Sequence, residues 1–213
     1  MIYSRLFFFI LITCLSTSLS AQDNNSIQLL APQINIGKPL MQALNSRQST
    51  RSFDAKQLPM QDISNLLWAA FGINRSDESK RTAPSARNWQ EIDIYVFLPE
   101  GVYIYRAKEN KLEQISNEDL RSLAGVQDFV KTAPLNLVYV SDQSKMGKAS
   151  DSDKMMYSGA DAGFIAQNVY LYCASEDFGV VVRAMVDKKA LAEKLNLKPE
   201  QVIVLAQTIG YKK

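Results

Sequence analysis

The stretch YSGADAGFIAQNVYLYCAS, Tyr157–Ser175, predicts the longest helix of the chain. Apolar and small residues cover most of its circumference, and a helix that is apolar all round must be buried on several sides. Small side chains also allow a second helix to approach closely. The stretch therefore indicates a central helix, placed where two subunits meet.

Shorter elements precede and follow this helix. The predicted helix at 59–71 has Pro59 at its start and Gly72 as its stop, and Asp187 occupies the N-cap position of a helix at 187–195. Further helices are predicted from Pro39 to about Leu44 and over 117–123, and strands over 92–98, 102–106, 135–140, 180–182 and 201–209. This mixture predicts an α+β fold, with helices on both faces of a sheet of about four or five strands.

The composition is that of one globular domain. The 213 residues are 46% hydrophobic and 22% charged, which suffices for a sizeable core. The formal net charge is +2 and no basic block occurs, so a nucleic-acid-binding function is disfavoured. The chain has no histidine, which excludes a Ser-His-Asp triad, a Cys-His pair and a His-ligated metal site. We expect no metal, and chemistry carried by a bound cofactor or by carboxylates and lysines.

The first 21 residues, MIYSRLFFFILITCLSTSLSA, are typical of a secretory signal peptide. Arg5 precedes an apolar run from Leu6 to Ile12 that is too short to span a bilayer comfortably, and small residues follow it. We expect export to the periplasm, with any membrane contact confined to this segment; an uncleaved anchor and a lipoprotein attached through Cys14 are the alternatives. Residues 22–38 are then a linker or N-terminal arm, and residues 39–213 form the folded domain. Cleavage leaves Cys173 as the only cysteine, in an apolar run that predicts a packed core thiol.

The stretch NSRQSTRSF, Asn45–Phe53, places two arginines around small hydroxyl side chains. Arg47 and Arg51 are four residues apart, so they share one face if the helix continues, and they converge easily if a turn intervenes. A guanidinium binds phosphate through two parallel hydrogen bonds, and Ser49 is able to donate a third. The residues alone leave two interpretations open, a solvated basic turn and an anion-binding site.

Five segments of the chain, in order, resemble motifs of the FMN-dependent nitroreductase-like flavoproteins. RQSTRSF is similar to the opening RRSxRxF motif, and TAPSARNWQ to a PSxxNxQ segment. The others are APLNLVYV, which resembles the central strand, SGADAGFIAQNVYLYCASEDFGVVV, which resembles the long helix with its AxxQNxxL pattern, and the ending QTIGYKK. Together they cover the chain from about Met41 to Tyr211. The branch that the chain resembles best contains the SagB-type dehydrogenases, which oxidise azolines in modified peptides.

This resemblance implies a homodimer with FMN enclosed between two chains, a central mostly antiparallel sheet flanked by helices, and a long buried helix at the dimer interface. It implies that Arg47, Ser49 and Arg51 bind the phosphate, with Gln48 in place of the usual second arginine. The other cofactor-binding residues that it implies are Pro84, Ser85, Ala86 and Asn88, which reach the flavin of the partner protomer, Gln127 at the ring edge, the backbone of Val182, Arg183 and Ala184 beside flavin N5, and Lys212 at the phosphate. Arg183 is the best candidate for a catalytic role, as a cation that stabilises the reduced flavin or binds an acidic substrate.

The implied activity is an FMN-dependent oxidoreductase that passes two electrons through flavin N5 to a small organic acceptor. Its electron donor would be NAD(P)H or another reductant. The alternative is an exported, non-catalytic flavin- or ligand-binding protein on the same scaffold. Export by the general secretory route favours this alternative, because FMN would then be acquired outside the cytoplasm, where nicotinamide donors are scarce.

Overall fold

The computed structural model describes residues 25–213. The predicted signal peptide lies outside these residues and stays a prediction, as do export and the cleavage that it would require. Among residues 25–213, no helix combines the length and the apolar character needed to cross a bilayer.

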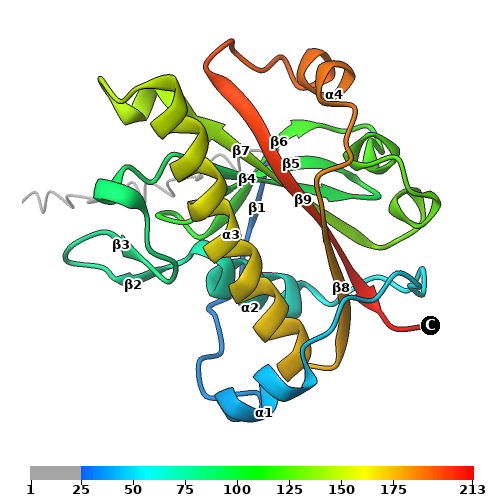
Figure 1. The fold of residues 1–213 in the computed structure, drawn as a ribbon. Coiled ribbons are helices and arrows are strands. Elements are labelled where there is room, and N and C mark those ends of the chain that lie inside the picture. Colours follow the sequence, from blue (N-terminus) through cyan, green and yellow to red (C-terminus); the bar gives the residue numbers. More distant parts are fainter. Residues whose placement is uncertain (1–24) are drawn as a thin grey trace, which may run out of the picture.

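A seven-stranded sheet forms the centre of the fold, in the order β1-β6-β5-β4-β7-β9-β8 (Figure 1). Every neighbouring pair in it is antiparallel. The strands are β1 (Ser26–Gln28), β4 (Ile92–Leu98), β5 (Gly101–Arg106), β6 (Lys111–Ser116), β7 (Leu135–Asp142), β8 (Phe178–Arg183) and β9 (Gln201–Tyr211), and β2 (Ile73–Arg75) pairs with β3 (Lys80–Arg81) in a separate hairpin. The predicted α+β class is confirmed, and the predicted strand number was too low because the polar strands β1 and β6 gave no clear signal.

Four α-helices flank the sheet: α1 (Leu40–Ser46), α2 (Met60–Phe71), α3 (Asp151–Ser175) and α4 (Lys188–Lys194). Short 3-10 helices occupy η1 (Ala86–Asn88), η2 (Arg121–Ala124), η3 (Asp128–Lys131) and η4 (Gln143–Met146). The helix predicted over 117–123 is wrong except at its end, where η2 begins. The Asp119 carboxylate accepts the Arg121 N–H at 3.2 Å, and this local bond favours a turn over a helix.

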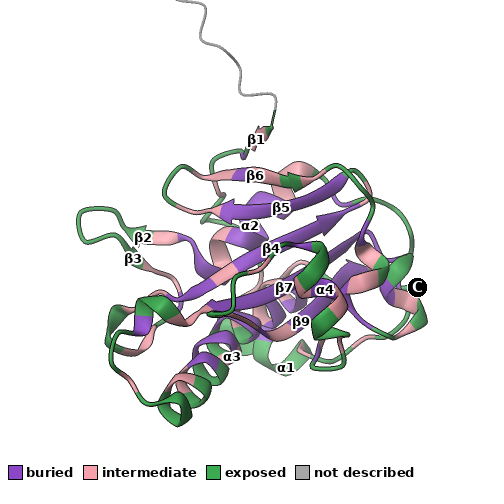
Figure 2. Ribbon diagram, turned by 90° about the horizontal axis from the view of Figure 1, so that it is seen from above, coloured by how far each residue is buried: buried purple, intermediate pink, exposed green. Residues whose placement is uncertain are grey.

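The two faces of the sheet are covered by different helices. Leu66 of α2 and Ile165 of α3 pack against the Leu137 side of β7, in the larger core. Leu191 of α4 packs against Val138, on the opposite face, because side chains alternate along a strand. The central strands are therefore buried along most of their length (Figure 2).

Helix α3 crosses in front of the sheet and begins six residues before the predicted start (Figure 1). Ser150 caps it by accepting the Asp153 N–H at 3.1 Å. One side of α3 contacts α1, α2 and the sheet, whereas Phe164 on the other side is 48% exposed. The described single chain therefore buries one side of α3 rather than several.

Candidate functional site

The segment that follows α1 lies along β8 and the C-terminal end of β9. The Thr50 N–H donates to the Val180 carbonyl at 2.8 Å, and Asp54 N–H donates to the Tyr211 carbonyl at 3.0 Å. Phe53 and Lys212 form an antiparallel bridge between these two bonds. Backbone hydrogen bonds therefore bring the RQSTR motif next to the end of β8 and next to Lys212, although these segments are far apart in the sequence.

Tyr170 of α3 connects this segment to β8. Its hydroxyl accepts the Val182 N–H at 2.9 Å and lies 2.8 Å from Ser49 Oγ, where either hydroxyl is able to donate. The Arg47 guanidinium lies 5.3 Å from the centre of the Tyr170 ring, which is cation–π distance. Sequence reasoning counted Tyr170 only as part of the apolar surface of its helix. The available signal was a phenol in a buried helix, because a buried Tyr hydroxyl usually has a hydrogen-bond partner.

A cavity of about 290 Å³ lies at the end of β8. It is lined by five of the predicted site residues, Arg51, Gln127, Val182, Arg183 and Ala184, together with Phe129, Val181 and Met185. Arg47 and Ser49 contact Tyr170, whose hydroxyl bonds to Val182 of the cavity lining. Lys212 pairs with Phe53, which packs against Phe129 of the lining. Gln48 is exposed on the same segment. The fold therefore collects all but four of the predicted residues into one region.

Arg183 is held by the wall of this cavity. Its side chain donates to Ala124 O at 2.7 Å, Thr208 Oγ1 at 2.8 Å and Asn136 Oδ1 at 3.2 Å. Its Nε is buried and has no partner among the described residues. Burial lowers the pKa of Arg183 to about 10, so the guanidinium remains charged at neutral pH. The wall of the cavity thus contains a fixed positive charge whose hydrogen bonds go to neutral acceptors.

Gln127 provides a second buried polar atom without a partner, its Oε1. Gly125 lies between the two side chains: a Cβ there would be 1.9 Å from Arg183 Nη1 and 3.1 Å from Gln127 Oε1. The loop therefore closes over Arg183 because residue 125 has no side chain. An unsatisfied amide oxygen beside several cations fits a ligand with a ring N–H and an anionic tail, as FMN has.

The remaining predicted residues, Pro84, Ser85, Ala86 and Asn88, lie elsewhere. The Ala86 N–H donates to Asp161 Oδ2 of α3 at 2.9 Å. Asp161 and Tyr170 are about 14 Å apart along α3, at 1.5 Å per residue. Within one chain these four residues therefore do not share the cavity at the end of β8.

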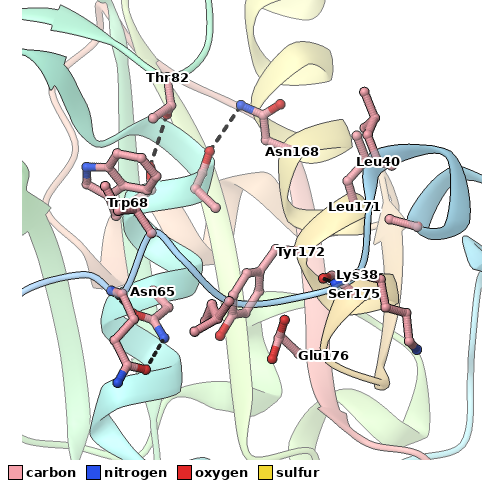
Figure 3. Close-up of a pocket in the computed structure, with 15 residues that line it drawn as sticks. Lys38, Leu40, Asn65, Trp68, Thr82, Asn168, Leu171, Tyr172, Ser175 and Glu176 are labelled. Atoms are coloured by element: carbon pink, nitrogen blue, oxygen red, sulfur yellow. Dashed lines mark hydrogen bonds between the residues drawn. The ribbon is translucent and has the colours of Figure 1, made fainter.

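A second cavity, of about 370 Å³, lies between residues 33–40, α2 and α3 (Figure 3). Trp68, Leu171 and Tyr172 provide apolar surface, and none of the predicted cofactor-binding residues lines it. Its one lysine or arginine, Lys38, already forms an ion pair with Asp177 at 2.7 Å, and Glu176 adds a negative charge. This cavity is therefore poorly suited to an anionic cofactor. Residues 25–213 also contain no group of His, Cys, Asp or Glu side chains that could hold a metal ion.

Comparisons with known proteins bear on the family and the fold of the chain. Residues 44–211 match the family model described as "Nitroreductase family". A protein of Methanocaldococcus jannaschii, named a nitroreductase by inference, is 29% identical over 194 residues, which cover 86% of this chain and 96% of that protein. The crystal structure of an inferred nitroreductase from Ralstonia eutropha JMP134 is 44% identical, with a TM-score of 0.85 over 89% of this chain and 90% of that chain. The NADPH:FMN oxidoreductase of Vibrio harveyi shares the fold at 19% identity, with a TM-score of 0.62 over 82% of this chain and 69% of that chain.

Proposed function

Because the chain belongs to the nitroreductase family, we propose that it is an FMN-dependent oxidoreductase that passes two electrons through flavin N5 to a small organic acceptor. One observation carries the proposal: the fold gathers Arg47, Ser49, Arg51 and Lys212 beside a cavity whose wall includes Gln127 and the end of β8. The comparisons support a flavin-dependent oxidoreductase in general terms. The identity of FMN and the roles of single residues are our proposal.

The cations of this region are suited to the phosphate of FMN. A phosphate group with roughly two negative charges binds best to planar guanidinium groups, which form paired hydrogen bonds with it. Arg51 lines the cavity, Arg47 lies over Tyr170, and Lys212 lies 4.0 Å from Asp177 in an exposed pair that exchanges easily. Ser49 adds a hydroxyl whose position is set by Tyr170.

The flavin ring would lie against the end of β8, where bound flavin supplies hydride chemistry at N5. Gln127 Oε1 would accept a ring N–H, which would satisfy an oxygen that otherwise lacks a partner. The backbone of residues 182–184 would set the position of the reacting edge. Arg183 would act through its charge, by stabilising the negative charge that accumulates on reduction, rather than by direct contact with a substrate.

A homodimer would complete this site. The cavity of one chain is at the lower limit of the roughly 300–1,000 Å³ typical of small-molecule sites. Large apolar side chains are exposed on α1 and on the outer side of α3: Leu40, Met41, Leu44, Met155, Met156 and Phe164. Exposed apolar surface of this kind is suited to a protein interface. A second chain docked on it would bring its own Pro84, Ser85, Ala86 and Asn88 to the flavin.

Other parts of the proposal come from the sequence. Residues 1–21 would direct export to the periplasm, residues 22–38 would form an arm, and residues 39–213 the flavin-binding domain. NAD(P)H or another reductant would supply electrons. Membership of the SagB-type branch stays a prediction.

The test uses flavin binding first and turnover second. The purified protein should be yellow or should become so on titration with FMN, and the colour should bleach with NADH or NADPH and recover in air. Arg47→Ala with Arg51→Ala should release FMN, whereas Arg75→Ala in the exposed β2–β3 hairpin should not. Equal occupancy in the double variant would contradict the phosphate assignment, and FMN binding without bleaching would favour a non-catalytic binding protein.

A further inference from the structure

Two buried carboxyl groups meet beneath the loop that contains Pro84 to Asn88. Glu91, just before β4, is fully buried, and Asp161 of α3 is 2% exposed. Both carboxyl groups bond to neighbouring residues of this loop, Glu91 to Ser85 and Asp161 to Ala86, and interaction with Asp161 is among the causes that raise the pKa of Glu91. The cations around this loop have other partners: Lys145 contacts Asp93 and the Gln90 carbonyl, Arg81 contacts the Gln90 side chain, and Arg87 lies over the Trp89 ring. None of these three cations therefore pairs with either carboxyl group.

The hydrogen bonds of this pair require a proton. Glu91 Oε2 accepts from Ser85 Oγ at 3.2 Å, and Asp161 Oδ2 accepts from the Ala86 N–H at 2.9 Å. Glu91 Oε1 is buried without a donor. Two ionised carboxylates have no hydrogen to share, but a protonated Glu91 donates to Asp161 and leaves no atom unsatisfied. Burial, and then the charge of Asp161, raise the pKa of Glu91 to about 7, which agrees with this reading.

The loop above the pair needs such an anchor. Arg87, Asn88 and Gln90 have φ values of 50°, 57° and 48°, in the left-handed region that residues with side chains rarely adopt. Strained backbone of this kind persists only when surrounding contacts hold it. These contacts include the Ala86–Asp161 bond, the Ser85–Glu91 bond and the Gln90 N–H donated to Ser85 Oγ at 2.8 Å, and the Gln90 side chain is held further by Arg81. Both carboxyl groups therefore hold the loop directly.

We propose that Glu91 and Asp161 share one proton, and that this shared proton holds the loop of residues 84–90 against α3. Loss of the proton above neutral pH loosens the loop. On deprotonation the proton leaves to solvent, and two negative charges then face each other with no cation between them. Glu91 and Asp161 are thus positioning residues for Pro84, Ser85, Ala86 and Asn88. The consequence for the cofactor rests on the proposed function, because these are the residues expected to reach the flavin of a partner chain.

Amide hydrogen exchange tests the shared proton without any flavin. Protection of the Ala86 and Gln90 amides is measured in the purified protein at pH 6 and pH 8, after correction for the intrinsic pH dependence of exchange. We expect about tenfold lower protection at pH 8, because one pH unit above a pKa of about 7 leaves roughly a tenfold excess of the deprotonated pair. Glu91→Gln should remove this pH dependence, since its amide donates to Asp161 at every pH.

Asp161→Asn is the second variant, because its amide donates to Glu91 while its oxygen still accepts the Ala86 N–H. Glu113→Gln is the matched control: Glu113 is exposed and bound to Arg106 at 2.7 Å, so the wild-type response should persist. Equal protection at pH 6 and pH 8 in the wild type, or an unchanged drop in both amide variants, would overturn the proposal. An FMN titration at the same two pH values is read separately. FMN that binds at neither pH, with the loop response intact, would reject the flavin function and leave the shared proton standing.

Discussion

Replacing Tyr170 by Phe removes one hydroxyl that supports two predicted parts of the site. The Val182 N–H would lose its acceptor and Ser49 its partner, while the ring beneath Arg47 would remain. A buried donor left without an acceptor costs about 1–3 kcal/mol, and the half-buried Val182 N–H is at the lower end of this range. Ser49 is exposed, so its hydroxyl is able to bond to water, and its loss adds little. We therefore expect the free energy of unfolding to fall by about 1 kcal/mol.

Urea denaturation followed by circular dichroism measures this change, with the transition midpoint compared at unchanged slope. The same variant should bind FMN about tenfold more weakly, which corresponds to about 1.4 kcal/mol, because Ser49 and the end of β8 lose their common support. Tyr157→Phe on the same helix is the control: the Tyr157 ring packs edge-on against Trp89 at 5.7 Å, so the ring contact should survive.

An unfolding free energy of Tyr170→Phe within about 0.5 kcal/mol of the wild type, the range of ordinary surface substitutions, would refute the reasoning about Val182. Normal stability with weakened FMN binding would restrict the role of Tyr170 to the cofactor. Equal loss in the Tyr157→Phe control would show that the effect does not depend on the hydroxyl at position 170.

Three further predictions concern stability. Gly125→Ala should destabilise the protein by about 1–3 kcal/mol. The added Cβ would lie 1.9 Å from Arg183 Nη1 and would displace a guanidinium that three acceptors hold. A thermal melt of the variant that matches the wild type would contradict this prediction. Asp187→Ala should cost about 1 kcal/mol in urea denaturation, because the carboxylate accepts the Ala190 N–H at 3.1 Å and caps α4, whereas Asp187→Asn should retain most of the stability. The pKa of Glu91 is raised from 4.5 to about 7 in the folded state, so the contribution of Glu91 to the free energy of unfolding is largest below pH 4.5 and is lost as pH rises to 7. A pKa shift corresponds to about 1.4 kcal/mol per unit, and solvent relaxation reduces this energy, so we expect the stability to decline by about 2 kcal/mol. Urea denaturation at pH 5 and pH 7.5 measures the decline, which the Glu91→Gln variant should not show.

Much of the fold followed from contiguous residues. Helix α2 lies between Pro59 and Gly72 as predicted, and α4 begins after the N-cap Asp187 as predicted. The central strands β4, β7 and β9 were also recognised, because buried strands have long apolar runs. Helix caps and apolar runs are local properties of the chain, so a single sequence reveals them.

Strands β1 and β6 were missed for a related reason. Residues 111–116 read KLEQIS, in which polar residues outnumber apolar ones, and β1 has three residues at the edge of the sheet. Edge positions do not need a continuous apolar run, so their pairing is decided by the neighbouring strand rather than by their own sequence. The order of the seven strands likewise depends on contacts between distant segments.

The sequence by itself indicated the family and the α+β class and predicted Arg47 and Arg51 as phosphate-binding residues, because motifs and composition are carried by short segments. Only the tertiary structure decided which of these residues meet. It placed Tyr170 between Ser49 and Val182, made Arg183 part of the cavity wall, and brought the buried carboxyl groups of Glu91 and Asp161 to the same loop. The contacts of Tyr170 and Asp161 depend on the crossing of α3 over the sheet, and those of Arg183 depend on the pairing of β7, β8 and β9, since a buried polar group is satisfied by whichever segment the fold brings within about 3 Å.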